Sequence, residues 1–165
     1  MNVQDVKLIF DYNYWANNKL LTTSTDVSQE QFTVPSNFPH GGLRGTLLHT
    51  LDAEYGWRVL CESGVETEDL KESDYPTAAS LIDHWHKEET AMRSYLNNLK
   101  DKDLTGMIHY TTNSGLKRER VLWHCLYHVV NHGTQHRSEA AAILTSFNHS
   151  PGDFDFSMFM LEKKK

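Results

Sequence analysis

Four long stretches of this 165-residue chain repeat apolar side chains at helical spacing, and this periodicity constrains the fold more than any other feature. Turn-forming residues separate the stretches: Gly41-Gly42 precedes the second, Pro76 precedes the third, and Pro151 follows the fourth. Helices of this length bury their apolar stripes by packing on one another. The pattern therefore predicts an all-α fold, a single domain over residues 1–165 arranged as an up-down four-helix bundle, with helices at about Val3–Thr23, Leu43–Ser63, Thr77–Leu99 and Arg120–Phe147.

The connecting segments predict three smaller elements. Before the last long helix, an alternating stretch, a turn of small polar residues and a second short stretch indicate a small β-hairpin or a loop. The crossover after the first helix contains two prolines, so it is expected to be irregular with one helical turn. A short apolar piece near the C-terminus is expected to form a helix packed on the bundle. These elements are Met107–Thr112, Asn113–Gly115 and Leu116–Glu119 for the hairpin, Thr25–His40 with a turn near Ser28–Gln31 for the crossover, and Phe154–Leu161 for the last helix.

Charge and composition exclude several classes of function. The formal charge is −6, from 16 Lys and Arg against 22 Asp and Glu. Nucleic-acid binders need a clustered positive field, and the basic run Lys163–Lys165 is expected to be only a solvated tail. Met1–Phe10 does not resemble a secretion signal, and no stretch is apolar enough to span a bilayer. Cys61 and Cys125 form no C-x-x-C pair. We therefore expect a cytoplasmic protein with reduced thiols and with neither nucleic-acid nor membrane partners.

Four of the ten histidines form a ladder at successive i+4 positions: His124, His128, His132 and His136. Chance would produce such a series only about 0.002 times in a chain of this composition. Each step advances roughly 40° around a helix and about 6 Å along it, so the four rings cannot all serve one site. His136 falls on the apolar seam of its helix and His132 lies close to it, whereas the other two are turned towards the rim or solvent.

The pair His132 and His136 is therefore the best candidate for metal binding from this helix. An i,i+4 pair brings two imidazole nitrogens to the same ion, and Gly133 between them leaves space against a neighbouring helix. The alternative is that both are ordinary core histidines held by hydrogen bonds. Two unpaired buried imidazoles would be costly, which favours the metal.

A third ligand must come from another helix, and His49 is the best candidate. The small residues Gly45, Ala53 and Gly56 lie on its side of the second helix and leave room for an ion and a bound molecule. The remaining histidines lie in predicted loops, in the hairpin or beside the apolar face of the third helix, and none has a comparable setting: His40, His84, His86, His109 and His149.

Three protein ligands leave at least one coordination position open, which is typical of a catalytic rather than a structural metal site. Other metal and nucleotide motifs are missing from the sequence. There is no H-E-x-x-H zincin motif and no E-x-x-H di-iron motif. G-x-S-x-G, P-loop and G-x-G-x-x-G motifs are missing as well.

Together with other segments of the sequence, these histidines make the chain resemble the DinB-like (damage-inducible, YfiT-like) family of metal-dependent enzymes. The resemblance covers nearly the whole chain, and the last histidine motif is its most specific part. It is carried by the segment Tyr12-Asn13-Tyr14-Trp15-Ala16-Asn17, by His49 with Glu54 and Trp57, by the run from His128 to Arg137, by the hairpin with Asn113 and Gly115, and by Asp153–Phe159.

The resemblance implies an up-down four-helix bundle, frequent homodimers, and a nickel or zinc ion on His49, His132 and His136. It also implies reactions of low-molecular-weight thiols such as bacillithiol or mycothiol with small electrophiles, or isomerisation or hydrolysis that uses such a thiol. One departure stands out: the family commonly continues His-Arg-Gly-Gln, whereas this chain has Ser138 and Glu139 at the last two positions. Glu139 adds a charge beside the site, so we expect this departure to affect the substrate rather than the metal.

The resulting hypothesis is that the metal binds a thiol or water, lowers its pKa, and so prepares it to attack an electrophile in an adjoining pocket. Trp15 and Trp57 are candidate pocket walls, with core packing as the alternative. Asp52 and Glu54 are candidates for orienting His49, with solvated or salt-bridged roles as the alternative. The metal should dissociate as the pH falls through roughly 6, because its ligands must be neutral imidazoles. The rival hypothesis is a non-catalytic binding or stress-response module that the metal only stabilises.

Overall fold

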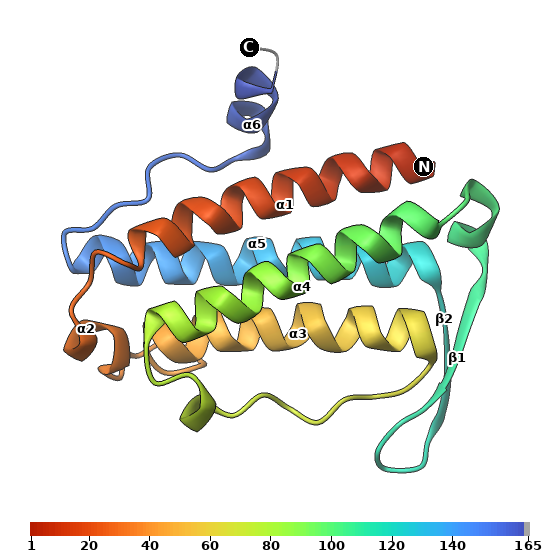
Figure 1. The fold of residues 1–165 in the computed structure, drawn as a ribbon, viewed down its shortest axis with the longest axis horizontal. Coiled ribbons are helices and arrows are strands. Elements are labelled where there is room, and N and C mark those ends of the chain that lie inside the picture. The colour runs from red at the N-terminus through yellow and green to blue at the C-terminus, as the bar shows by residue number, and fades with distance from the viewer. Residues whose placement is uncertain (164–165) are drawn as a thin grey trace.

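The computed structural model describes residues 1–163 and shows four long helices packed as a bundle (Figure 1). Each boundary lies within two residues of the range that the apolar periodicity predicts. The predicted all-α bundle is therefore confirmed. The four helices are α1 (Val3–Thr23), α3 (Leu43–Ser63), α4 (Ala78–Asn98) and α5 (Leu122–Ser146).

Side-chain caps fix where several helices begin. At the start of α1, Asn2 Oδ1 accepts a hydrogen bond from the Asp5 amide (3.0 Å), and Asp5 Oδ2 accepts one from the Asn2 amide (2.9 Å). Such reciprocal bonds satisfy amide groups that have no partner within the helix. Ser28 and Gln31 form the same arrangement at α2 (Gln29–Thr33), so the helical turn predicted in the crossover is confirmed.

The helix directions depart from a simple up-down alternation. α1 and α5 run one way, whereas α3 and α4 both run the other way (Figure 1). Between α3 and α4, residues 64–77 return along the bundle: Val65 bridges to Thr111 at one end, and at the other end Pro76 O accepts a hydrogen bond from Gln29 Nε2. About 14 extended residues span roughly 45 Å. That exceeds the length of α3, about 32 Å for a helix of 21 residues.

The predicted β-hairpin is confirmed at the end of the bundle where α3 and α4 finish and α5 starts (Figure 1). β1 (Met107–Thr111) and β2 (Lys117–Val121) pair antiparallel, with Met107 opposite Val121 and Thr111 opposite Lys117. The Leu122 amide donates to Gly106 O (3.0 Å), which ties the first residue of α5 to the start of the hairpin. A short 3₁₀ turn, η2 (Asp101–Thr105), joins α4 to β1.

All four long helices contribute fully buried apolar side chains to the core. Phe10 comes from α1, Leu51 from α3, Met92 from α4 and Leu144 from α5, and each is completely inaccessible to solvent. Burial of such side chains is the main source of stability in a bundle of this size. It also fixes the relative rotation of α3 and α5, the two helices that carry the candidate metal ligands.

The predicted C-terminal helix is confirmed as α6 (Phe156–Glu162), which lies on the outer side of α1 (Figure 1). Lys163 Nζ donates to Asp11 Oδ2 on α1 (2.8 Å), while the last two residues of the predicted basic tail, Lys164 and Lys165, lie outside the described residues. Among the helices of residues 1–163, none combines the length and the apolar character needed to cross a membrane.

Candidate metal centre

The three histidines grouped from the sequence lie together between α3 and α5. His49 Nε2 and His132 Nε2 are 3.1 Å apart. The ring centre of His136 lies 4.7 Å from that of His49 and 4.4 Å from that of His132. The planes of these rings are inclined at 89° and 62°, so the rings meet edge to face rather than stacking. The centres of the three predicted rings, which come from two helices, therefore lie within 4.9 Å of one another.

The rest of the ladder lies where the helical angles predict. His136 is buried, with 4% of its surface exposed, and His132 is partly buried. His124 and His128 are exposed, as the sequence indicated. The His128 ring still lies 5.6 Å from the His132 ring, so it marks the solvent-facing rim of the site.

The protonation states of the cluster fit a metal site. Burial, together with repulsion from the neighbouring imidazoles, lowers the pKa of His49 to about 4 and that of His132 to about 3. Both rings are therefore neutral near pH 7, which is the form that binds metal, and they stay neutral at pH 6. The metal release expected near pH 6 from the ordinary pKa of imidazole therefore does not apply to these two ligands. Two nitrogens bonded to one ion at about 2.1 Å each are about 3.0–3.4 Å apart. The 3.1 Å between the two Nε2 atoms falls within that range.

Glu139 gives His136 a defined orientation. Its Oε2 lies 2.7 Å from His136 Nδ1, one turn along α5. A carboxylate at this distance accepts the Nδ1 hydrogen, which fixes the tautomer and leaves the Nε2 lone pair free. The sequence identified Glu139 only as an added charge beside the site. Its i,i+3 spacing from His136 was the signal that could have revealed this pairing.

His40 is a member of the cluster that the sequence did not reveal. It precedes α3, and its ring stacks on that of His49 with centres 3.6 Å apart and planes 11° apart. Its ring also meets that of His136 edge to face at 5.0 Å. One ring nitrogen each of His40, His49 and His136 lies within 4.8 Å of the others, so among residues 1–163 the set with metal-ligand spacing contains His40 in place of the predicted His132. A loop residue follows no helical periodicity, so nothing in the sequence placed it here.

Asp52 and Glu54, the candidates for orienting His49, make their hydrogen bonds elsewhere within residues 1–163. Asp52 Oδ1 accepts from the Leu70 amide (2.9 Å) and so holds the segment that returns to α4. Glu54 Oε2 accepts from Asn13 Nδ2 on α1 (3.2 Å). Burial raises the pKa of the Glu54 carboxyl to about 7, although the Tyr14 hydroxyl and the Asn13 amide partly oppose this shift.

A buried polar network lies directly behind His136. The Arg137 guanidinium, 2% exposed, donates from Nη1 to Asn13 Oδ1 (2.5 Å) and to Asn17 Oδ1 (2.8 Å). Because Asn13 also donates to Glu54, its amide links a buried cation to a buried carboxyl and joins α1, α3 and α5. A Cβ on Gly133 would lie 2.8 Å from Arg137 Nη1 and 3.0 Å from Asn13 Oδ1. The space expected at Gly133 is therefore filled by this network.

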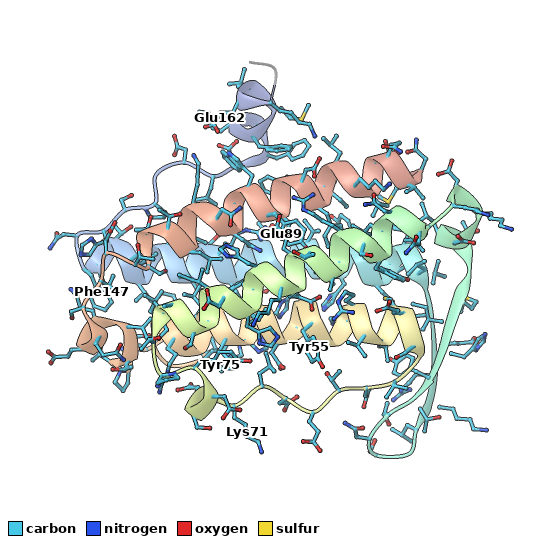
Figure 2. All side chains as sticks on the ribbon, in the orientation of Figure 1. Tyr55, Lys71, Tyr75, Glu89, Phe147 and Glu162 are labelled. Carbon is cyan, nitrogen blue, oxygen red and sulfur yellow. The ribbon has the colours of Figure 1, made fainter. Side chains whose placement is uncertain are left out.

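The two candidate tryptophans lie in different surroundings. Trp15 packs against Phe159 of α6, with ring centres 5.7 Å apart, and its Nε1 donates to Glu162 Oε2 (2.8 Å). Glu162 lies on the outer side of α1 (Figure 2), so Trp15 does not line the histidine site. The Trp15 ring instead packs against α6 and holds that helix on the bundle. Trp57 is closer to the site, because its ring meets that of His128 edge to face at 5.0 Å.

Two clefts include Trp57 in their lining. One, of about 500 Å³, is lined by Trp57, Arg120, Cys125 and His128 among others. The second, of about 490 Å³, includes Asp52, Gly56, Trp57 and Arg120. The residues that line these two clefts do not include His49, His132 or His136. The Arg120 guanidinium lies 5.7 Å from the Trp57 ring and is common to both clefts. These volumes suit small-molecule ligands.

Comparisons with known proteins match the chain over nearly its whole length. A family model described as "DinB family" matches residues 1–164. Among curated proteins, "Protein DinB" of Bacillus subtilis (strain 168) is 27% identical over 172 residues, an alignment that covers 95% of this chain and 95% of that protein. Helices α1, α3 and α5, which build the candidate site, all lie within the matched range of the family model.

Proposed function

The chain belongs to the DinB family, and we propose that it is a metal-dependent enzyme with His49, His132 and His136 as its protein ligands. The observation that supports this most is the 3.1 Å approach of His49 Nε2 and His132 Nε2, beside a His136 ring whose Nδ1 is held by Glu139. The Glu139 contact leaves the Nε2 lone pair of His136 free for an ion, and neutral Nε2 atoms are the ligand form of imidazole.

The proposed metal is a divalent ion, with nickel or zinc as the family resemblance implies. Neutral imidazoles suit both metals, and three protein ligands leave at least one position for a further ligand. When bound, such an ion acts as a Lewis acid and lowers the pKa of a thiol or of water. The chain supplies the neutral imidazoles, and Glu139 holds the hydrogen of His136 on Nδ1.

The proposed reaction is a thiol-dependent S-transfer or hydrolysis on a small-molecule electrophile, in stress or detoxification chemistry. A low-molecular-weight thiol as co-substrate follows from the family resemblance. The clefts beside Trp57 would hold these molecules: the indole offers an apolar face, and Arg120 offers a positive charge for an anionic group. We also propose that the protein is a homodimer and that it is cytoplasmic.

The test is a conjugation assay on protein purified without a histidine tag. Zinc- or nickel-loaded protein is mixed with a panel of low-molecular-weight thiols and a haloarene electrophile, and the thioether product is measured. We expect turnover with at least one thiol, and none above background for metal-stripped protein or for His132→Ala. If the metal raises the melting temperature but no pair reacts, the protein is a metal-stabilised module rather than an enzyme.

A further inference from the structure

The loop that leads into α3 places His40 against the outer face of His49. The rings are nearly parallel, 11° apart, with centres 3.6 Å apart. We propose that His40 is a positioning residue of the metal centre: its ring fixes the plane of the His49 ligand without itself binding the ion. The inference rests on the proposed function, because it presumes that His49 is a ligand.

The ring geometry separates His40 from the three ligands. The lone pair of an imidazole nitrogen lies in the plane of its ring. Since the planes of His40 and His49 are nearly parallel and 3.6 Å apart, their lone pairs do not point at a common position. The His49 ring is instead inclined at 60° to that of His132 and at 89° to that of His136, and its Nε2 lies 3.1 Å from His132 Nε2.

The backbone holds His40 firmly in this position. Gly45, in the first turn of α3, lies so close to the loop that a Cβ there would overlap the His40 carbonyl oxygen. A Cβ on Gly42 would likewise overlap the Val34 carbonyl oxygen, and Ser36 Oγ donates to Gly41 O. Because two glycines permit this close packing, the loop lies directly against the helix and cannot accommodate larger side chains there without moving.

His49 needs such a constraint because it differs from His136. The His136 ring is oriented by Glu139, whereas the hydrogen bond found for the His49 ring within residues 1–163 is the one to His132 itself. With a metal bound, that contact no longer orients the ring. The stacked face of His40 then limits rotation of the His49 ring, as a hydrogen-bonded carboxylate does for other metal-binding histidines.

The experiment compares His40→Ala with His40→Phe, because phenylalanine keeps a flat ring and loses the nitrogens. Zn²⁺ affinity is measured by competition with a chromophoric chelator, and the ligand environment is read from the visible spectrum of the Co²⁺-loaded protein. We expect His40→Ala to bind Zn²⁺ about 10-fold more weakly. His40→Phe should stay within about 3-fold of wild type, with an unchanged cobalt spectrum.

Gly45→Ala should displace the His40 backbone from the side of α3, because the new Cβ would overlap the His40 carbonyl oxygen. It should therefore weaken Zn²⁺ binding as His40→Ala does. Circular dichroism of the metal-free variants checks that they fold. Equal losses in His40→Phe and His40→Ala, with a shifted cobalt spectrum, would mean that His40 bonds the metal, and the proposal would be overturned. Affinities of both variants equal to wild type would overturn it as well. A wild-type protein that binds no Co²⁺ would instead remove the proposed function itself.

Discussion

At the scale of single residues, each ring of the histidine cluster is held by a different contact. A carboxylate oxygen orients His136, the face of His40 covers His49, and His132 approaches His49 through its Nε2. Partial burial keeps the pKa of His49 and of His132 far below the usual value for imidazole, so neither ring carries a proton near neutral pH. Neutral nitrogens that are already positioned are what a metal site requires.

Glu139 is expected to set the metal affinity through His136. Glu139→Ala removes the acceptor 2.7 Å from His136 Nδ1 and leaves the ring free to rotate. We expect the Zn²⁺ dissociation constant to rise about 10- to 100-fold, measured by chelator competition. Ser138→Ala, an exposed neighbour on the same helix, is the control and should bind as wild type does. Equal affinities for Glu139→Ala and wild type would show that the carboxylate does not orient the ring.

Gly133→Ala tests the buried network. Alanine normally stabilises a helix relative to glycine by about 0.5–1 kcal/mol. Here the new methyl group would lie 2.8 Å from Arg137 Nη1 and 3.0 Å from Asn13 Oδ1, so it would push apart the hydrogen bond between them. We expect a net loss of about 2 kcal/mol in the free energy of unfolding, measured with urea on metal-free protein. A gain in stability would contradict this account of the glycine.

Glu54 is expected to make stability depend on pH. Its pKa is about 7 in the folded protein and 4.5 in the unfolded chain, since burial disfavours the charged carboxylate. A raised carboxyl pKa contributes stability that is fully present below pH 4.5 and is lost as the pH rises through 7, on the order of 3 kcal/mol in total. Glu54→Gln should lack this contribution, so its stability relative to wild type should increase between pH 5 and pH 8. Urea unfolding of both metal-free proteins across that range provides the measurement, and a constant difference would refute the assignment.

At the scale of elements, apolar spacing and end signals were enough to predict the long helices, α2, the hairpin and α6. The direction of α4 was not predictable, because residues 64–77 are long enough either to turn back at once or to run the length of the bundle. The hydrogen bond from the Leu70 amide to Asp52 Oδ1 holds them in the second arrangement. Such a contact between a loop and a helix follows no periodicity.

Contacts made by loops also limited how much of the candidate site could be predicted from the sequence. His132 and His136 followed from angles within one helix, and His49 from the small residues around it. The place of His40 in the cluster could be seen only in the structure, because it depends on how a loop packs against α3. Trp15 belonged to a helix whose inner and outer faces are both aromatic, so sequence alone did not show that α6 covers it.

The docking of α6 should be separable from the metal site. Phe159, 6% exposed, packs on Tyr12 and Trp15 on the outer side of α1. Phe159→Ala should cost about 3 kcal/mol of unfolding free energy in urea, yet leave Zn²⁺ affinity within about 2-fold of wild type. Phe156→Ala, at a position 42% exposed, should cost less than about 1 kcal/mol. A large drop in affinity for Phe159→Ala would mean that α6 and the metal site are coupled.

At the scale of the whole molecule, the candidate centre joins α3, from the first half of the chain, to α5 near its end. A metal that binds the folded protein and not the unfolded chain stabilises it by mass action. The bundle already has an apolar core on all four long helices, so we expect the metal-free protein to stay folded with a lower melting temperature. This behaviour would distinguish the protein from small domains that fold only around their metal.

The central claim is that His49, His132 and His136 bind one divalent ion. Its most direct test is the metal content of untagged protein after loading with zinc or nickel and gel filtration, determined by elemental analysis. We predict about one ion per chain in wild type and almost none in His132→Ala. His124→Ala, which changes an exposed histidine of the same helix, is the control and should also bind about one ion. Metal-free wild type after loading, or full occupancy in His132→Ala, would contradict the account.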